Sequence, residues 1–266
     1  MKTDRKIMAI VNLTEDSYFP ESRCSGVEAA LLRISRMIDE GADIIDIGAC
    51  STRPGSVPVG ADEEWRRLAP VLAAVRERFP DIRISIDTYW ASVVEKAYGL
   101  IGDFMVNDIS AGEDDPAMLP TVARLGLEYV AMHKRGDSMT MQSMTDYGDV
   151  TSEVIAYFED FAVRAADTGI ERWILDPGFG FAKTVEQNYR LLRDLPMIAE
   201  RFPRILVGVS RKSMIYKPLG LGPEDVLAAT QAVHMAALLG GAEIIRVHDV
   251  KEGRQTIKLY QMAYNS

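Results

Sequence analysis

The sequence contains few of the residues that build metal clusters or disulfide frameworks. Two cysteines, Cys24 and Cys50, and three histidines occur in 266 residues. The cysteines have no metal-ligand spacing and cannot form a disulfide framework, so we interpret both as small reduced side chains. This composition fits a reducing compartment, and the cytoplasm is the expected location.

The sequence also lacks an excess of positive charge and any long apolar run. Its 30 Lys and Arg residues are outnumbered by 39 Asp and Glu residues, which gives a formal net charge of −9 at pH 7. Binding to a phosphate backbone needs a basic face, so nucleic acid is not expected as a partner. The first apolar run, residues 7–11, is too short for a signal peptide, and no run approaches the roughly 20 residues of a membrane span. A soluble protein with no membrane partner is therefore predicted.

What the sequence does have is a repeated alternation of short apolar runs with longer stretches of helical periodicity. Eight runs are typical of buried strands: residues 7–11, 44–47, 82–86, 104–106, 129–132, 173–175, 205–209 and 244–247. A plausible helix follows each of them, and residues 225–239 and 251–263 supply the last two. Eight such units in a chain of this length match a (β/α)8 TIM barrel, an α/β fold.

A doubly wound sheet is the alternative architecture. It would usually need fewer strands or an early Gly-x-Gly-x-x-Gly motif, and neither is seen. The 47% hydrophobic content supplies ample core, and no Pro-, Ser- or Gly-rich linker divides the chain. We therefore predict a single-domain barrel over residues 1–266.

Polar side chains stand at the carboxyl ends of the apolar runs. The set comprises Asn12, Asp87, Asn107, Asp176, Lys212, Arg246 and His248. Any one of them has a structural explanation, since Asp87 before Thr88 could cap a helix and Asn107-Asp108 could make a turn. In a barrel, however, these strand ends converge on the face that carries the site, and seven at equivalent places favour a functional rim.

The rim combines two kinds of chemistry. Asp176 and Asp87 accept hydrogen bonds when ionised, while Asn107 both donates and accepts, so together they complement a purine-like or pterin-like heterocycle edge. Four potential cations supply the opposite chemistry: Arg53, Lys212, Arg246 and His248. The planar fork of arginine matches phosphate oxygens. The sequence therefore predicts a site with a heterocycle end and a phosphate end.

An ordered series of motifs resembles that of the dihydropteroate synthase family. It runs through residues 12–17 (NLTEDS), 41–48 (GADIIDIG), 51–55 (STRPG), 85–88 (SIDT), 107–109 (NDI), 132–133 (MH), 140–142 (TMQ), 176–181 (DPGFGF), 208–213 (GVSRKS) and 246–250 (RVHDV). A single motif of this kind is weak evidence. The whole series in the family's order, from residue 7 to residue 252, is highly specific.

The resemblance implies a transferase of folate biosynthesis. The family joins 6-hydroxymethyl-7,8-dihydropterin diphosphate to 4-aminobenzoate and releases diphosphate and 7,8-dihydropteroate. The route is dissociative: the bond to diphosphate breaks first, and the aryl amine captures the resulting pterin methyl cation. The family uses Mg2+, which keeps many of its waters and needs few protein ligands. A homodimer through the late helices is also implied.

The resemblance assigns roles position by position. The pterin residues are Asp87, Asn107, Met132, Asp176 and Lys212. The diphosphate residues are Asn12, Thr52, Arg53, Arg246 and His248, with Asn12 near the metal. The aminobenzoate residues are Tyr18, Pro54, Phe181, Lys212 and Ser213. The catalytic residues are Asp87, Lys212, Arg246 and Asp16, the last as a candidate to stabilise the developing cation.

Two other functions share part of this pattern. Pterin-binding methyltransferases that act on methyltetrahydrofolate share the barrel and the Asp/Asn pocket, but they have no use for the diphosphate residues. A non-catalytic pterin-binding homologue would bind without turnover. The chain also departs from the family pattern at Glu15, Tyr18, Cys50, Lys134 and Ala182, and none of these changes removes a residue assigned to pterin or phosphate.

Overall fold

The computed structural model describes residues 4–13, 23–50, 59–136 and 140–264. Its strands are β1 (Lys6–Asn12), β2 (Ile44–Gly48), β3 (Arg83–Asp87), β4 (Met105–Asp108), β5 (Glu128–Met132), β6 (Trp173–Asp176), β7 (Leu206–Val207) and β8 (Ile244–Val247). Each corresponds to one of the eight predicted apolar runs. The predicted strand count is therefore confirmed.

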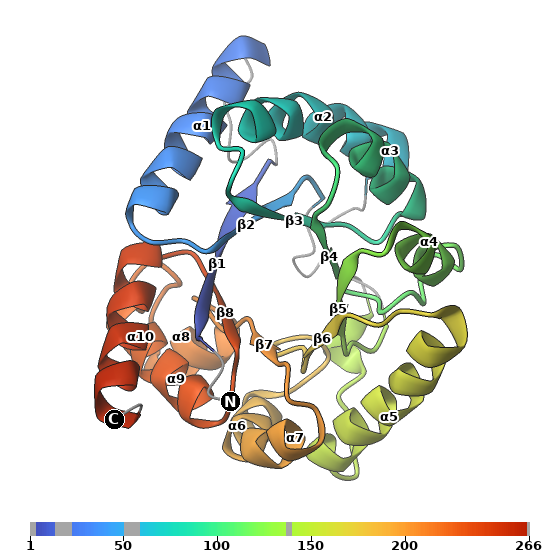
Figure 1. The fold of residues 1–266 in the computed structure, drawn as a ribbon. Coiled ribbons are helices and arrows are strands. Elements are labelled where there is room, and N and C mark those ends of the chain that lie inside the picture. The colour runs from blue at the N-terminus through green and yellow to red at the C-terminus, as the bar shows by residue number, and fades with distance from the viewer. Residues whose placement is uncertain (1–3, 14–22, 51–58, 137–139, 265–266) are drawn as a thin grey trace.

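All eight strands pair in parallel in one sheet. The order of neighbours is β6-β5-β4-β3-β2-β1-β8-β7, and Leu175 of β6 forms a parallel bridge to Ile205, next to β7. That bridge closes the ring seen in Figure 1, in which helices surround the strands. The predicted (β/α)8 barrel is confirmed, and the doubly wound alternative is wrong.

The helices are α1 (Arg23–Asp39), α2 (Ala61–Arg78), α3 (Ala91–Ile101), α4 (Met118–Leu125), α5 (Val150–Thr168), α6 (Val185–Arg193), α7 (Leu195–Arg201), α8 (Ser213–Leu219), α9 (Leu227–Leu239) and α10 (Val250–Tyr264), with a short 3-10 turn at Met141–Ser143. Two helices follow each of β6 and β7, where one was expected. The helix after β6 starts on a local signal, because Thr184 and Gln187 form a capping box at α6. The helix after β7, α8, has Lys212 at its N-cap and no side-chain cap. Among the described residues no helix is long and apolar enough to cross a membrane.

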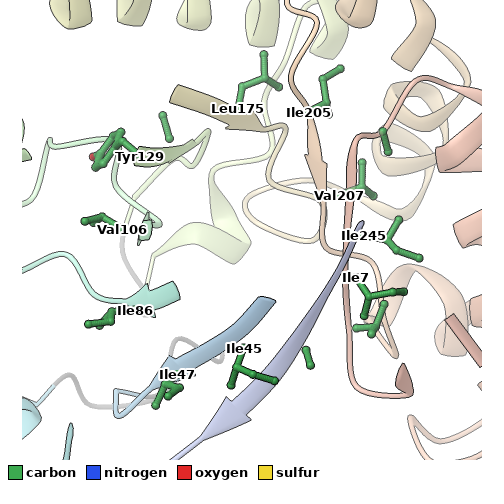
Figure 2. Close-up of a cluster of buried hydrophobic side chains, with 14 of the residues drawn as sticks. Ile7, Ile45, Ile47, Ile86, Val106, Tyr129, Leu175, Ile205, Val207 and Ile245 are labelled. Atoms are coloured by element: carbon green, nitrogen blue, oxygen red, sulfur yellow. The ribbon is translucent and has the colours of Figure 1, made fainter. Parts of the chain in front are cut away.

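The main core lies between the sheet and the helices. Figure 2 shows its members on the outer side of the strands, among them Ile45 and Ile47 of β2. Phe158 and Phe161 of α5 are fully buried against this layer. Burying a side chain of this size contributes about 1.5 to 3 kcal/mol, so this layer fixes which side of each strand faces outward.

A smaller apolar layer fills the barrel interior. It consists of Met8, Ile44, Met105, Val130, Ile174, Leu206 and Ile244, one residue from each of seven strands. Successive strand residues point to opposite faces, so the residue two positions further on also points inward. That rule places Asp46, Asn107 and Arg246 in the next interior layer, toward the carboxyl ends of the strands.

The amino-terminal end of the barrel is closed by a charged network. The Arg204 guanidinium reaches Glu128 at 2.5 Å and Glu243 at 2.8 Å, and Arg83 pairs with Glu128 as well. Both carboxylates are almost fully buried. Because paired charges and an apolar layer fill this end, a ligand site has room only at the opposite end.

Candidate active site

The strand register brings several of the predicted site residues side by side. Asp87 of β3 lies opposite Asn107 of β4, and Met132 of β5 lies opposite Asp176 of β6. Asn107, Met132 and Asp176 are each 6% exposed or less. Residues far apart in the chain therefore share one small region at the carboxyl end of the barrel.

Asp46, in the middle of β2, is the centre of this region and was not predicted as a site residue. Its carboxylate accepts hydrogen bonds from the Ser85 hydroxyl (2.6 Å), the Asn107 amide (3.2 Å) and Nε of Arg246 (2.7 Å). It is fully buried. A carboxylate two positions after the inward-facing Ile44 was the signal in the sequence that could have identified it.

Arg246 joins two carboxylates. Besides Asp46, its Nη2 contacts Oδ2 of Asp87 at 2.8 Å, while its Nη1 makes no hydrogen bond with a described residue. Burial lowers the pKa of Arg246, but the Asp46 and Asp87 carboxylates outweigh it and the net pKa is raised. Burial likewise raises the pKa of Asp87, and Arg246 opposes that rise. One arginine nitrogen therefore stays available for an anion while the others hold the acidic pair.

Asp87 does not cap the helix that follows it. The first amide of α3, on Ala91, donates to Asp115 (2.8 Å), and the Trp90 amide donates to the Thr88 hydroxyl (3.2 Å). Neighbouring polar groups thus supply the caps. The Asp87 carboxylate is left for Arg246, as expected of a rim residue.

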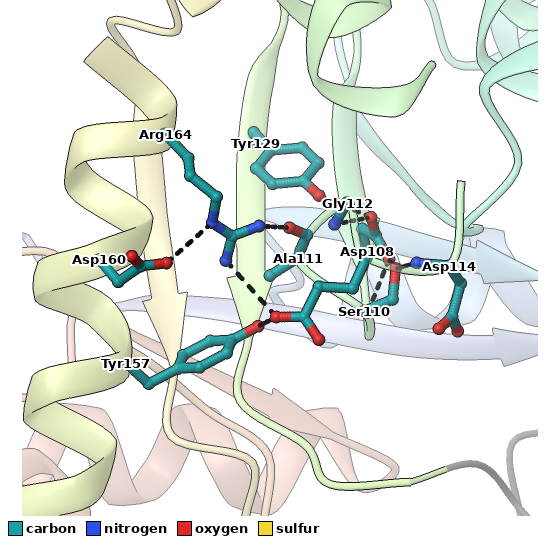
Figure 3. Close-up of polar contacts among 10 residues, drawn as sticks. Asp108, Ser110, Ala111, Gly112, Asp114, Tyr129, Tyr157, Asp160 and Arg164 are labelled. Atoms are coloured by element: carbon teal, nitrogen blue, oxygen red, sulfur yellow. Dashed lines mark hydrogen bonds and ion pairs between the residues drawn. The ribbon is translucent and has the colours of Figure 1, made fainter. Parts of the chain in front are cut away.

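The sequence Asn107-Asp108 divides into an inward and an outward side chain. Asp108 is fully buried on the outer side and accepts hydrogen bonds from the Ser110 amide and hydroxyl (both 2.7 Å), the Gly112 amide (2.9 Å) and the Tyr129 hydroxyl (2.6 Å). Figure 3 shows this set of contacts beside Arg164 of α5. Asp108 therefore makes the turn, and Asn107 is free to face the barrel interior.

Asp176, Lys212 and Arg246 approach one another around Gly208. A Cβ atom at Gly208 would lie 3.8 Å from Oδ2 of Asp176 and 3.9 Å from Nζ of Lys212. The other Asp176 oxygen accepts a hydrogen bond from the Gly178 amide at 2.8 Å. Burial raises the pKa of Asp176, and Lys212 opposes this; burial also lowers the pKa of Lys212 to about 8, against the effect of Asp176. The pair supplies an acceptor and a cation within one buried pocket.

Phe181 and Ser213 lie beside Lys212. The Lys212 ammonium sits 4.6 Å from the centre of the Phe181 ring and donates to the Phe179 carbonyl at 2.6 Å. Ser213 is the first residue of α8, directly after Lys212. An aromatic ring, a cation and a hydroxyl suit an aromatic ligand that carries a carboxylate.

His248 and Ser210 form the next part of the rim. His248 Nδ1 lies 3.0 Å from the Ser210 hydroxyl. Burial, together with the positive charge of Arg246, lowers the pKa of His248 to about 4, so the imidazole is neutral near pH 7. Arg211 turns away and forms two hydrogen bonds with Asp249, 2.8 and 2.9 Å long. His248 therefore offers a neutral hydrogen-bonding group, not the cation that the sequence suggested.

Several predicted site residues lie outside the described part of the chain. They are Asp16, Tyr18, Thr52, Arg53 and Pro54. Asn12 is described: it ends β1 beside Gly48 of β2 and is half-buried. The described residues contain no group of three or more His, Cys, Asp or Glu side chains that could hold a metal ion. A hard cation there would depend on the Asn12 amide oxygen, water and ligand oxygens, which is compatible with Mg2+.

Glu64, in the first turn of α2, is a further buried carboxyl group near Asp87. It is fully buried, and neither oxygen has a hydrogen-bond partner among the described residues. Burial raises its pKa from 4.5 to about 7. The nearby Thr88 hydroxyl opposes this rise, but its position does not allow a hydrogen bond of ordinary geometry.

The raised pKa of Glu64 predicts a pH-dependent stability. The folded state holds the proton more tightly than the unfolded state, so this contribution is complete below pH 4.5 and is lost as the pH rises through 7. Glu64→Gln should therefore stabilise the protein by about 1 to 3 kcal/mol near pH 8 and by much less near pH 5. Thermal unfolding at both pH values tests this. Glu77→Gln, exposed on the same helix, is the control, and an equal gain in both variants would contradict the assignment.

Known proteins share both the sequence and the fold. The family model described as pterin binding enzyme matches residues 8–248. Dihydropteroate synthase of Synechocystis is 42% identical over 256 residues, which cover 95% of this chain and 88% of that protein. The folic acid synthesis protein fol1 of Pneumocystis carinii is also 42% identical, and the chain spans 35% of its length.

The fold comparison agrees. The crystal structure of dihydropteroate synthase from Clostridium difficile, obtained in the presence of pteroic acid, matches with a TM-score of 0.92 at 35% sequence identity and covers 100% of both chains. The sequence comparison and the fold comparison therefore indicate the same family. The chain belongs to the dihydropteroate synthase family of pterin-binding enzymes.

Proposed function

We propose that this protein condenses 6-hydroxymethyl-7,8-dihydropterin diphosphate with 4-aminobenzoate to give 7,8-dihydropteroate and diphosphate. The observation that carries the proposal is the buried arrangement in which Arg246 joins Asp46 to Asp87 beside Asp176 and Lys212. It combines acceptors for a heterocycle with cations for an anionic leaving group. Family membership supports the same reaction, since pteroic acid, present with the C. difficile protein, contains a pterin joined to aminobenzoate.

The pterin occupies the interior end of the site in this proposal. Asp176 has one oxygen held by the Gly178 amide and the other available for the amino and ring N–H donors of the pterin. Asn107, fixed by Asp46, contributes a mixed donor and acceptor. Met132 is buried opposite Asp176 and supplies an apolar contact. These groups sit at strand ends, so they are positioned before the ligand arrives.

Leaving-group stabilisation is the proposed source of catalysis. The unused Nη1 of Arg246 and the neutral imidazole of His248 would donate hydrogen bonds to the diphosphate as the bond to carbon breaks. Asp87 and Asp46, together with Asp176, place negative charge near the pterin, which favours a developing methyl cation over the starting state. No side-chain nucleophile is required, because the aryl amine captures the cation directly and then loses one N–H proton to solvent.

Mg2+ is proposed to neutralise part of the diphosphate charge. Asn12 would be its ligand from the protein, and its amide oxygen at the end of β1 suits a hard cation. Thr52 and Arg53 would complete the diphosphate contacts on the protein side. Asp16 keeps its proposed role beside the developing cation.

The aminobenzoate slot is proposed to lie between Phe181, Lys212 and Ser213, with Tyr18 and Pro54 completing it. The Lys212 ammonium and the Phe181 ring are 4.6 Å apart, so a ring stacked on Phe181 can place its carboxylate within reach of Lys212 or Ser213.

Turnover is the decisive test of this function. The purified protein should form dihydropteroate from the pterin diphosphate and 4-aminobenzoate with Mg2+, and EDTA should reduce the rate. Product formation is followed by chromatography. Binding of the pterin diphosphate without product would favour a non-catalytic homologue, and methyl transfer from methyltetrahydrofolate would favour the methyltransferase alternative.

The proposed site predicts an order of binding. Pro54 of the aminobenzoate slot directly follows Thr52 and Arg53 in the sequence, and those two residues are assigned to the diphosphate. Binding of diphosphate should therefore help to form the slot. We expect 4-aminobenzoate to bind weakly to the free protein and clearly better with Mg2+, diphosphate and a pterin present. Calorimetric titration under both conditions measures this, and equal affinities would mean that the slot forms without the diphosphate.

The remaining expectations concern the setting in which the enzyme acts. We propose one pterin-binding domain over residues 1–266, a cytoplasmic location and a homodimer formed through the late helices. Exposed apolar side chains on α9 and α10, Leu239, Leu259 and Met262, support the dimer. Sedimentation analysis measures the oligomeric state.

A further inference from the structure

Lys183 is a buried cation to which the proposed reaction gives no role. It lies at the end of the turn between β6 and α6 and is 7% exposed. Its Nζ lies 3.0 Å from Nδ1 of His133, 3.0 Å from the Gly178 carbonyl oxygen and 3.1 Å from the Phe181 carbonyl oxygen. A buried amine is costly unless it is fully hydrogen-bonded, and these three partners satisfy it.

His133 is suited to be one of these partners. Burial, with the nearby Lys183 and Arg135 charges, lowers the pKa of His133 to about 2, so its imidazole is neutral. Its ring packs edge-on against Tyr157, with ring centres 4.9 Å apart. Burial lowers the pKa of Lys183 to about 7, against the opposing effect of Asp176. The contact is satisfied in either state, because the ammonium donates to Nδ1 and the neutral amine accepts from Nδ1–H.

The turn that Lys183 holds has a left-handed backbone at three residues. Gly178, Gly180 and Ala182 all have positive φ, at 70°, 84° and 50°. A Cβ at Gly178 would lie 1.9 Å from the His133 carbonyl oxygen, so the turn lies directly against the end of β5. Glycine adopts positive φ without strain, but Ala182 does so only where surrounding contacts hold it. Lys183, the next residue, supplies such contacts by binding the carbonyls of Gly178 and Phe181.

The same turn is held from the site side by Lys212. The Lys212 ammonium donates to the Phe179 carbonyl and lies over the Phe181 ring. Lys183 binds the adjacent carbonyls of Gly178 and Phe181. Both lysines therefore help to set the position of the Phe181 ring. They also set the orientation of the Phe179 carbonyl, to which Lys212 donates its hydrogen bond.

We propose that Lys183 and His133 form a buried clamp that sets the position of Phe181 and so determines the affinity for the aminobenzoate. Lys183 is then a positioning residue, since it acts through the turn and not by contact with a substrate. The inference rests on the proposed function, in which Phe181 lines the aminobenzoate slot. Lys183 therefore has a different role from Lys212, which faces the site and contacts the ligand in the proposed function.

The test compares the effect of a Lys183 variant on 4-aminobenzoate with its effect on the pterin diphosphate. Lys183→Met removes the polar contacts but keeps an unbranched stem, and Lys258→Met, exposed on α10, is the control. We expect the KM for 4-aminobenzoate to rise about tenfold or more in Lys183→Met, while the Kd for the pterin diphosphate changes less than about threefold. Calorimetry of both ligands and steady-state kinetics provide the two readouts.

Two further variants make the test independent of a folding failure. Lys183→Gln retains two N–H donors for the turn carbonyls, so its rise in aminobenzoate KM should be smaller than that of Lys183→Met. His133→Leu should raise the same KM, and combining it with Lys183→Met should add little, because both remove the same contact.

The outcomes are distinct. If the wild type is active and both Lys183→Met and Lys183→Gln keep its KM for 4-aminobenzoate, the clamp is wrong and the proposed function stands. Equal losses of affinity for both substrates also overturn it, since they would show a general structural role. A wild type that forms no dihydropteroate removes the proposed function, and with it the inference.

Discussion

Asp176→Asn should lower the affinity for the pterin by about 2 to 4 kcal/mol, which is about 30- to 900-fold. One Asp176 oxygen already accepts the Gly178 amide, so the Asn oxygen will keep that bond. The new NH2 group then takes the place of the other oxygen, which faces the ligand donors and lies near Lys212. Two donors would face each other, and a charged hydrogen bond would be lost. Isothermal titration with the pterin diphosphate measures the change.

Asp108→Asn is the matched control for this prediction. Asp108 is also a fully buried carboxylate at a strand end, but it accepts its hydrogen bonds on the outer side of the barrel. Its replacement should lower the free energy of unfolding and leave the pterin affinity of the folded protein nearly unchanged. If Asp176→Asn bound the pterin as well as the wild type, the pocket would have to lie elsewhere.

Arg246→Lys should lower turnover about 100-fold, because a point charge cannot reproduce the guanidinium fork. In the wild type, Nε and Nη2 hold Asp46 and Asp87, which leaves Nη1 for the diphosphate. A single ammonium cannot make all of these contacts. Binding of a pterin that lacks diphosphate should weaken much less, by under about tenfold, since only the positions of Asp46 and Asp87 would relax.

Arg254→Lys makes the same chemical change on the amino-terminal side of the barrel. Arg254 donates to the Gly41 carbonyl at 3.0 Å and pairs with Asp43, just before β2. Turnover by this variant should stay close to that of the wild type. The contrary result is that Arg246→Lys loses equal affinity for the pterin with diphosphate and for the pterin without it. That result would mean that Arg246 positions the acidic residues and does not bind the leaving group.

Local patterns in the sequence predicted the strands and the rim positions correctly. Each apolar run became a strand, because burial on both faces selects short β-branched and aliphatic segments. Asn107 and Asp176 were predicted from their position at the ends of such runs, and Met132 was predicted from the motif resemblance. The register places all three at the same end of the barrel. These features depend on a few neighbouring residues, so the chain itself reveals them.

Other features depend on residues that the sequence does not bring together. The extra helices after β6 and β7, α7 and α8, were missed because each has only 7 residues, too few turns to show a clear helical periodicity. The neutral state of His248 was missed because burial is set by the whole barrel and lowers its pKa to about 4. Motif order could assign these residues to a site, but not their charge or partners.

The sequence by itself determined that polar groups stand at the ends of six of the eight predicted strands, and that a heterocycle and a phosphate are the ligands these groups suit. Only the tertiary structure decided that Asp46 is the common partner of Asn107 and Arg246, the latter 200 residues away in the chain. It also decided that Asn107 faces inward while Asp108 faces outward. The physical reason is that strand alternation fixes only two opposite faces. Which face becomes the interior, and which charges meet there, follows from closure of the barrel.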